Sequence, residues 1–566
     1  MPLISYKPFW SETAILWGAG ATASLDVPTT DKMGKIIRKL AENKDGKNIE
    51  ERINEVSIFY DIETELGCFL KALGDNLKEY EAGFDNESIK IAKKILPEDF
   101  TEEKIKKKIL QWKAHYDWDA LCCLAMKVPV VSGDYVIYIM DLYNIIDGSL
   151  LNNHGVQVHN TADNTQVFLY PHRLRAARNL LVLLSSLMMA CAYHKTRKES
   201  RGKFSPYLGF VEILGELMQR EAIDLDRLEY DKRNFYVMSH SIISFNFEPI
   251  FLWFRFMEND ELNKNPPHIG KRNLPVKLYH DFAVFTAIRD SKKQQLEAYY
   301  PVNETVARHI NGIENGGCLF RICKFYYVHG STNIRECENC GKMMIILGEW
   351  SQISEELFSP PPFRTNLFKR TPRTKEERDA YGEGKYDAVQ CPFCSNMTYA
   401  HNSTMIMQTA YKGGHTSFLE EIQRDAKVSL SGAKHIILMG YQLPPDDAVW
   451  RSAIVAKQNK KDVYCSVVVG CSGEHKWIKG EELVKYVKEK KKSVEKEKWA
   501  EYGVNAIDAA IAIFGEGHVR AYTGGIPQVW CSGGTADKDK VRDLLYPSNI
   551  FPNGVANMRI ENWEKI

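Results

Sequence analysis

Four cysteines are spaced so that they could bind one metal ion. They form two C-x-x-C pairs, Cys337 with Cys340 and Cys391 with Cys394, on either side of a stretch rich in Pro, Lys and Arg at residues 360–378. Each C-x-x-C turn presents two thiolates, and two such turns complete a tetrahedral Zn²⁺ site with no open position. We therefore predict a structural zinc site, with four unrelated thiols as the alternative.

Asn246 and His329 are candidates for orienting and proton-transfer chemistry. Asn246 follows a predicted buried strand at residues 241–245, and His329 follows an aromatic strand that includes Phe325. An asparagine amide can orient hydroxyl groups and a water molecule, and a histidine that titrates near neutrality can accept a proton. Ligands bind at the carboxyl ends of the strands in open α/β sheets. Taken singly, the asparagine is better explained as a turn residue and the histidine as a hydrogen-bonded residue at a strand end.

A glycine turn could bind a phosphate. The apolar run Ile15, Leu16 and Trp17 is followed by Gly18-Ala19-Gly20 and by small residues at 21–24 that could start a helix. A strand, a glycine turn and a helix N-terminus together let backbone N–H groups approach a pyrophosphate. The pattern is weak by itself, and no acidic residue ends a recognisable second strand about twenty positions on, where an ordinary dinucleotide fold holds its ribose.

Alternating strands and helices must position these residues. A helix is predicted over residues 417–429, and buried strands are predicted over residues 434–440 and 462–469. Such strand–helix–strand steps are typical of an α/β fold with a parallel sheet.

Residues 50–222 are predicted to be mostly helical, with a hairpin or loop near residues 152–168 and a buried helix that begins near Pro171. One helix face is formed by Ile105, Ile109, Trp112 and Tyr116. A lysine-rich helix is predicted over residues 481–502, with Leu483, Val487 and Val494 on its inner face and a solvated outer face.

Size, charge and cysteine usage limit the class of protein. With 566 residues the chain should form two or three domains, and its formal net charge of +1 does not imply a nucleic-acid ligand. No secretory signal is visible, and the longest apolar run, Leu180–Tyr193, is too short to span a bilayer. Its 13 cysteines, an odd number that includes the two pairs, indicate a reducing cytosol, so we expect a cytoplasmic protein without a membrane anchor.

Four segments together resemble a known family. In chain order they are Gly18-Ala19-Gly20 with Pro28, the segment 244–248, His329-Gly330-Ser331 followed by the cysteine pairs, and Gly440-Tyr441-Gln442-Leu443-Pro444. In this order they resemble the sirtuin superfamily, and more closely its divergent prokaryotic NAD-hydrolase branch. The similarity covers residues 10–35, 233–256, 325–345 and 385–470.

The resemblance implies a fold, a substrate and a set of site residues. It implies a sirtuin-like Rossmann-type parallel sheet, NAD⁺ as substrate, Asn246 as the residue that orients the ribose and a water, and His329 as the catalytic base. The residues that it assigns to the cofactor are Gly18, Ala19, Gly20, Thr22, Pro28, Ser244, Phe245, Glu248, Gly440, Tyr441 and Gln442.

Departures from the family pattern favour hydrolysis over deacylation. Sirtuin deacylases carry an aspartate, an aromatic residue and an arginine after the cofactor-loop proline, where this chain has Thr29, Thr30 and Asp31. The Phe-Gly-Glu segment that receives an acyl-peptide does not follow Cys394. We therefore expect an NAD⁺ glycohydrolase of the antiphage type that depletes NAD in infected cells. The alternatives are an NAD-dependent protein deacylase, which the cysteine pairs favour, and a non-catalytic scaffold that binds NAD or ADP-ribose.

The same resemblance suggests a division into domains and a set of partners. We expect an NAD-binding domain at residues 1–49, 225–335 and 395–566, a helical insertion at 50–224 and a zinc module at 336–394. By analogy, the chain is expected to form homo-oligomers and to contact an ATPase or another defence partner, for which the insertion offers a surface.

Overall fold

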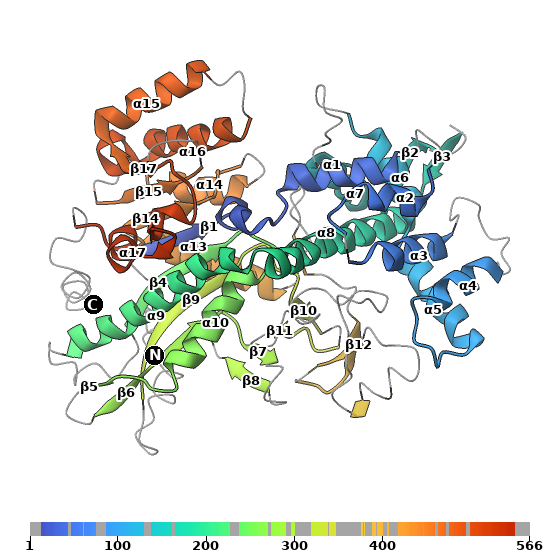
Figure 1. Ribbon diagram of the computed structural model, residues 1–566, viewed down its shortest axis with the longest axis horizontal. Coiled ribbons are helices and arrows are strands. Elements are labelled where there is room, and N and C mark those ends of the chain that lie inside the picture. The colour runs from blue at the N-terminus through green and yellow to red at the C-terminus, as the bar shows by residue number, and fades with distance from the viewer. Residues whose placement is uncertain are drawn as a thin grey trace, which may run out of the picture.

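A nine-stranded sheet occupies the left half of the computed structural model as drawn in Figure 1. The structure describes residues 13–42, 47–59, 61–74, 86–129, 139–160, 165–226, 237–269, 273–289, 296–299, 318–337, 339–346, 388–391, 393–399, 404–406, 417–444, 447–458, 462–470, 475–493 and 498–548, with a few isolated positions. The strand order is β16-β17-β15-β14-β1-β4-β9-β6-β5. Their bounds are β1 Thr13–Trp17, β4 Val237–Ser244, β5 His268–Ile269, β6 Leu274–Asp281, β9 Leu319–Tyr327, β14 His435–Met439, β15 Tyr464–Val468, β16 Trp477–Lys479 and β17 Val519–Tyr522.

Parallel pairing runs through the sheet from β17 to β6, and only the edge strands β16 and β5 pair antiparallel. Every residue of β1 and β14 is buried, as expected for strands covered on both faces. The predicted α/β class with a parallel-dominated sheet is therefore confirmed.

The strand order reverses beside β1. The chain passes from β1 to β4 on one side, and returns much later to place β14 on the other side. In open α/β sheets the crevice at such a reversal, outside the carboxyl ends of the strands, is where ligands bind.

The region before α9 forms a helical lobe beside the sheet (Figure 1). Its helices are α1 Thr30–Ala41, α2 Ile49–Asn54, α3 Glu63–Leu73, α4 Asn86–Lys93, α5 Glu102–His115, α6 Trp118–Lys127, α7 Ile139–Leu151 and α8 Pro171–Glu199. The predicted start of α8 at Pro171 is confirmed, as is the predicted hairpin, formed by β2 Val156–His159 and β3 Gln166–Leu169. On α5 the predicted inner residues Ile105, Ile109 and Trp112 are buried.

Helix α8 is long and apolar enough to cross a bilayer on composition alone. However, 89% of its apolar window is buried inside the protein, which is typical of a core helix. The length and composition of α8 are therefore only weak evidence for a membrane span.

Helices α9 Ser205–Asp226 and α10 Ile250–Leu262 pack on each other and on the main sheet. Arg255 on α10 donates to Val211 O on α9 at 3.3 Å. The final part of the predicted insertion, 50–224, thus covers one face of the sheet and also continues the helical lobe. One continuous set of buried apolar side chains joins the two regions.

The remaining helices follow β13 Met397–Tyr399 along the chain. They are α13 Ser417–Gly432, α14 Ala448–Val455, α15 Gly480–Ser493, α16 Lys498–Phe514 and α17 Lys538–Leu545. The prediction of one helix over 481–502 is wrong, because α15 ends at Ser493 and α16 begins at Lys498. Lysines in the last turn of α15 interact favourably with the negative end of the helix dipole. Leu483 and Val487 are buried as predicted, and Val494 lies outside the described residues.

Candidate functional site

The four predicted metal ligands lie together. Their sulfur atoms are all within 4.8 Å of one another, with Cys337 Sγ 3.5 Å from Cys394 Sγ and Cys340 Sγ 3.8 Å from Cys391 Sγ. Tetrahedral coordination with Zn–S bonds of about 2.3 Å separates the sulfurs by about 3.8 Å. The described residues therefore include a four-cysteine cluster that could hold a metal such as zinc.

Two similar turns bring the cysteines together. Gly341 N donates to Cys337 O at 2.7 Å, and Ser395 N donates to Cys391 O at 2.9 Å. Gly341 and Ser395 both adopt left-handed backbone conformations, with φ of 65° and 60°. Each turn joins a pair of antiparallel strands, β10 Ile334–Glu336 with β11 Met343–Ile346 and β12 Ala388–Gln390 with β13.

A small sheet attaches the cluster to the rest of the chain. Strand β11 pairs with β7 Thr286–Arg289, which pairs with β8 Leu296–Tyr299. The rings of Phe285 and Phe393 lie 4.9 Å apart, so one cysteine turn packs against the start of β7. The described elements around the cluster thus extend beyond residues 336–394 on both sides, while the division into domains stays a prediction.

The glycine turn after β1 packs against the turn after β14. Gly18 N donates to Met439 O at 2.9 Å and Gly20 N donates to Gly440 O at 3.1 Å. A Cβ atom on Gly440, whose φ is 60°, would lie 2.3 Å from Ala21 N. Glycine is therefore required here because two backbones touch, and these two N–H groups already have acceptors. Phosphate binding by the turn stays a prediction.

The expected helix start at residues 21–24 is wrong. The structure has two short 3-10 turns, Ala19–Ala21 and Ala23–Leu25, and α1 begins only at Thr30. Asp26, in the left-handed conformation, ends the second turn and prevents the helix from continuing.

Asn246 lies in a buried polar cluster beside this turn. Its Nδ2 donates to Glu248 Oε1 at 2.9 Å and to Thr22 Oγ1 at 3.3 Å, and Thr22 Oγ1 donates to the same Glu248 oxygen at 3.1 Å. Asn246 is only 4% exposed, and its Oδ1 has no hydrogen-bond partner among the described residues. The amide is therefore held by its nitrogen, and its oxygen is left to accept a bond from another molecule.

Glu248 completes the cluster from the start of α10. Its Oε2 accepts from Ile250 N at 2.8 Å. Burial raises the pKa of Glu248 to about 7, although bonds from Asn246, Ile250 and Thr22 act against that rise. The carboxyl group therefore exchanges a proton near neutral pH.

This raised pKa predicts a loss of stability as the pH rises from mildly acidic to neutral. Folded protein keeps the Glu248 proton up to about pH 7, whereas an unfolded chain releases it near 4.5, so the folded state binds more protons between these values. The free energy of unfolding should fall from pH 5 to pH 8 by on the order of 3 kcal/mol more in the wild type than in Glu248→Gln. Urea denaturation at several pH values measures this difference. The exposed Glu481→Gln variant is the control, and identical pH dependence in wild type and Glu248→Gln would refute the prediction.

His329 lies at the carboxyl end of β9, in an aromatic setting. Its ring is 5.4 Å from Phe245 in an edge-to-face arrangement and 6.4 Å from Phe247. Phe245 in turn stacks on Tyr441 with a centroid distance of 4.0 Å. His329 and Asn246 thus occupy the same end of the sheet, and Phe245, the neighbour of Asn246, contacts the imidazole.

Asp447 is a site residue that the sequence analysis did not identify. Its Oδ1 lies 3.2 Å from His329 Nε2, close enough for an ion pair with a protonated imidazole, although the two atoms are not aligned for a hydrogen bond. Tyr441 Oη donates to its Oδ2 at 2.9 Å. Asp447 precedes α14 in the N-cap position but makes no cap bond, and an aspartate at the start of a helix would by itself suggest only a cap.

The structure brings most predicted site residues to this edge and buries them. Buried there are Gly18, Thr22, Pro28, Ser244, Phe245, Asn246, Glu248, His329 and Tyr441, while Gly20 and Gly440 are half-buried and Ala19 and Gln442 are exposed. Ser244 Oγ accepts from Asn246 N at 3.3 Å. The exposed pair marks the point where this cluster reaches the surface.

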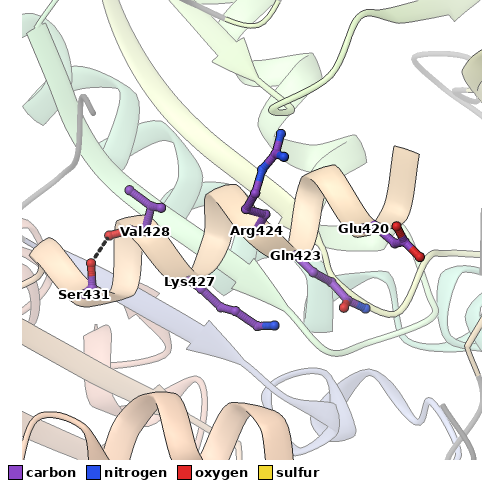
Figure 2. A pocket seen from close by; sticks show the side chains of 6 residues that line it. All are labelled: Glu420, Gln423, Arg424, Lys427, Val428 and Ser431. Carbon is purple, nitrogen blue, oxygen red and sulfur yellow. Dashed lines mark hydrogen bonds between the residues drawn. The ribbon is translucent and has the colours of Figure 1, made fainter. Parts of the chain in front are cut away.

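Helix α13 supports His329 from outside. Figure 2 shows a hollow lined by one face of this helix, with Glu420, Gln423, Arg424, Lys427, Val428 and Ser431. Gln423 Nε2 donates to Val328 O at 2.8 Å, directly before His329. The Lys427 ammonium lies 5.8 Å from the centre of the Trp450 ring, which packs on Phe245. This hollow lies on the α13 side of the candidate site, and neither Asn246 nor His329 lines it.

Comparison with known proteins adds no assignment. No protein-family model matches the chain, and no curated protein matches it in sequence.

Proposed function

We propose that this protein is a sirtuin-like NAD⁺ glycohydrolase that releases nicotinamide and ADP-ribose. The observation that carries the proposal is the Asn246 side chain, which Glu248 and Thr22 hold through its nitrogen beside the point where the strand order reverses. Its buried Oδ1 has no partner in the part of the chain that the structure describes. That oxygen can accept a bond from a ribose hydroxyl or from a water molecule.

The chemistry suits these residue types. Nicotinamide in NAD⁺ is a cationic leaving group, so the breaking N-glycosidic bond gives its electron pair to the nicotinamide ring and leaves an oxocarbenium-like ribose. Water then bonds to the anomeric carbon, and His329 accepts the proton that the water loses. Glu248, with a pKa near 7 beside Asn246, can buffer that proton at the same end of the sheet.

Substrate access would use the surface around Ala19 and Gln442. These residues are exposed, whereas Asn246 and His329 are 4% and 3% exposed. NAD⁺ binding therefore requires the turns after β1 and β14 to separate locally.

We further propose that the protein acts in the cytoplasm as an antiphage effector, as a homo-oligomer or with an ATPase or other defence partner.

Incubation of the full chain with NAD⁺ and no peptide tests the activity. Nicotinamide and ADP-ribose should appear in equal amounts. A deacylase would instead give O-acyl-ADP-ribose, and only when acylated peptide is added, while a scaffold would bind NAD⁺ or ADP-ribose without turnover. The assay is repeated with the candidate partner ATPase encoded beside the chain, and absence of nicotinamide under both conditions would refute the proposal.

Asp447 should act by positioning His329. Asp447→Asn removes the negative charge beside the imidazole and keeps the size of the side chain. We expect kcat to fall on the order of ten- to hundredfold with KM for NAD⁺ nearly unchanged, because the substrate contacts remain while the base is less well oriented.

Tyr441→Phe is the matched variant for this prediction, since it keeps the ring and removes the bond that Tyr441 Oη donates to the other Asp447 oxygen. Its effect on kcat should be smaller. Equal kcat in wild type and Asp447→Asn, or a change confined to KM, would contradict the positioning role.

A further inference from the structure

The segment that follows the glycine turn, residues 21–26, is held by two helices of the neighbouring region. Tyr207, near the start of α9, donates its hydroxyl hydrogen to Ala21 O at 2.6 Å. Thr196, in the last turn of α8, donates to Leu25 O at 2.9 Å. The end of α8 and the start of α9 therefore fix this turn segment near both of its ends.

The Tyr207 side chain is itself fixed on several sides. It is only 1% exposed, and Ser24 Oγ lies 2.7 Å from its hydroxyl oxygen. Because the Tyr207 hydrogen is used in the bond to the backbone, Ser24 is the donor in this second bond. The Tyr207 ring packs edge-to-face on Trp530 at 5.5 Å, and Trp530 stacks on Trp17, the last residue of β1, at 6.4 Å. The hydroxyl group is therefore a rigid support for the turn segment.

The same segment carries Thr22 into the candidate site. Thr22 Oγ1 accepts from Asn246 Nδ2 at 3.3 Å and donates to Glu248 Oε1 at 3.1 Å. The carbonyl group of Ala21 belongs to the peptide group that joins Ala21 to Thr22. Any shift of that peptide group moves Thr22 relative to Asn246, and Tyr207 opposes such a shift.

We infer that Tyr207 is a positioning residue of the candidate site, which fixes the peptide group before Thr22 and through Thr22 the orientation of the Asn246 amide. Tyr207 lies within the predicted insertion at residues 50–224, so a helix of that region contributes to the geometry of the site. The catalytic consequence rests on the proposed NAD⁺ cleavage, whereas the effect on the turn segment can be measured without it.

Hydrogen exchange of the full chain, followed by mass spectrometry, tests the support of the turn segment without a substrate. Tyr207→Phe keeps the ring and removes the donor to Ala21 O. The backbone amides of residues 21–26 should exchange about tenfold faster than in the wild type, because the loss of a buried hydrogen bond shifts a local opening equilibrium by roughly that factor.

Tyr522→Phe is the matched control. Tyr522 is 4% exposed, and its hydroxyl group also donates to a backbone oxygen, that of Gln528, at 3.1 Å. Its strand, β17, is separated from β1 by β15 and β14. This variant should leave both the exchange of residues 21–26 and the release of nicotinamide at the wild-type values. Thermal unfolding checks that each variant is folded.

Nicotinamide release tests the catalytic consequence. Tyr207→Phe should lower kcat on the order of tenfold and change KM for NAD⁺ much less, because it disturbs the group that orients Asn246. When Thr22 is already replaced in Thr22→Val, adding Tyr207→Phe should have little further effect on kcat, as expected for two residues that act through one contact. A residue that only stabilises the fold would show no such dependence on Thr22.

Equal exchange of residues 21–26 in the wild type and Tyr207→Phe overturns the inference, whether or not the chain cleaves NAD⁺. A wild-type kcat in folded Tyr207→Phe, or independent effects of Tyr207→Phe and Thr22→Val on kcat, also overturns it. If the wild type itself releases no nicotinamide, the proposed function fails separately, and faster exchange in Tyr207→Phe still supports the role of Tyr207 in holding Thr22.

Discussion

Nicotinamide release from NAD⁺ should fall by about 10³-fold in Asn246→Ala. Removing the amide deletes a buried acceptor that has no partner among the described residues, and it removes the bonds from Asn246 that orient Glu248 and Thr22. Loss of one preorganised polar group at a reacting centre typically costs about 10²–10³ in kcat, and loss of the positioned water adds to that. Steady-state nicotinamide release, measured on folded protein, gives the value.

Asn259→Ala is the matched control for this variant. Asn259 is also 4% exposed and lies on α10, but its amide bonds to His280, away from the glycine turn. Both variants should lose about 1–3 kcal/mol of stability through broken buried hydrogen bonds. Only Asn246→Ala should lose activity. If a folded Asn246→Ala enzyme keeps its kcat, or if Asn259→Ala loses as much, the proposed role of Asn246 is wrong.

Local patterns in the sequence were sufficient for the strands that carry the site. Apolar runs such as residues 14–17 and 436–439 are typical of strands in a sheet covered on both faces, and the glycine directly after each run marks the end of the strand. The cysteine pairs were equally explicit, because metal coordination fixes both residue type and spacing.

Contacts between segments that are distant in the sequence could not be predicted from such local patterns. The sequence offers Gly440 as a flexible residue, but only the structure gives the reason, which is contact with the backbone of Gly20 and Ala21. Leu443 adopts a left-handed φ of 54° without any glycine-like signal. Asp447 follows shortly after and faces His329, more than a hundred residues earlier in the chain, so its role depends on the order of the strands and not on its neighbours.

Helix α9 illustrates the same limit on a larger scale. Its residues predicted a helix in an insertion, yet the helix packs on α10 and on strands β4, β6 and β9. An amphipathic pattern gives the buried face of a helix but does not name the partner surface. The boundary between the insertion and the sheet domain therefore could not be placed from periodicity.

Replacing Cys391 by serine should unfold the cysteine module and, through it, disturb His329. Structural zinc sites contribute apparent binding free energies of about 10–16 kcal/mol, so losing one of four thiolates should cost several kcal/mol and one equivalent of bound zinc. The module borders the site directly: Ile406 N, shortly after β13, donates to His329 O at 2.7 Å, and Ile334 N at the start of β10 donates to Ser331 O at 3.1 Å.

Metal content and thermal unfolding of Cys391→Ser measure the first effect, and nicotinamide release measures the second. Cys318→Ser, at a half-buried cysteine outside the cluster, should keep both zinc and activity. A chelator applied to the wild type should reproduce the Cys391→Ser result, because a metal ion bound by all four sulfurs would hold the two cysteine turns together. If Cys391→Ser binds a full equivalent of zinc and unfolds like the wild type, the four sulfurs do not form one coordination site. The hydrogen bonds between this module and the His329 segment would then be held by the hairpins that contain β10 and β13, without a metal ion.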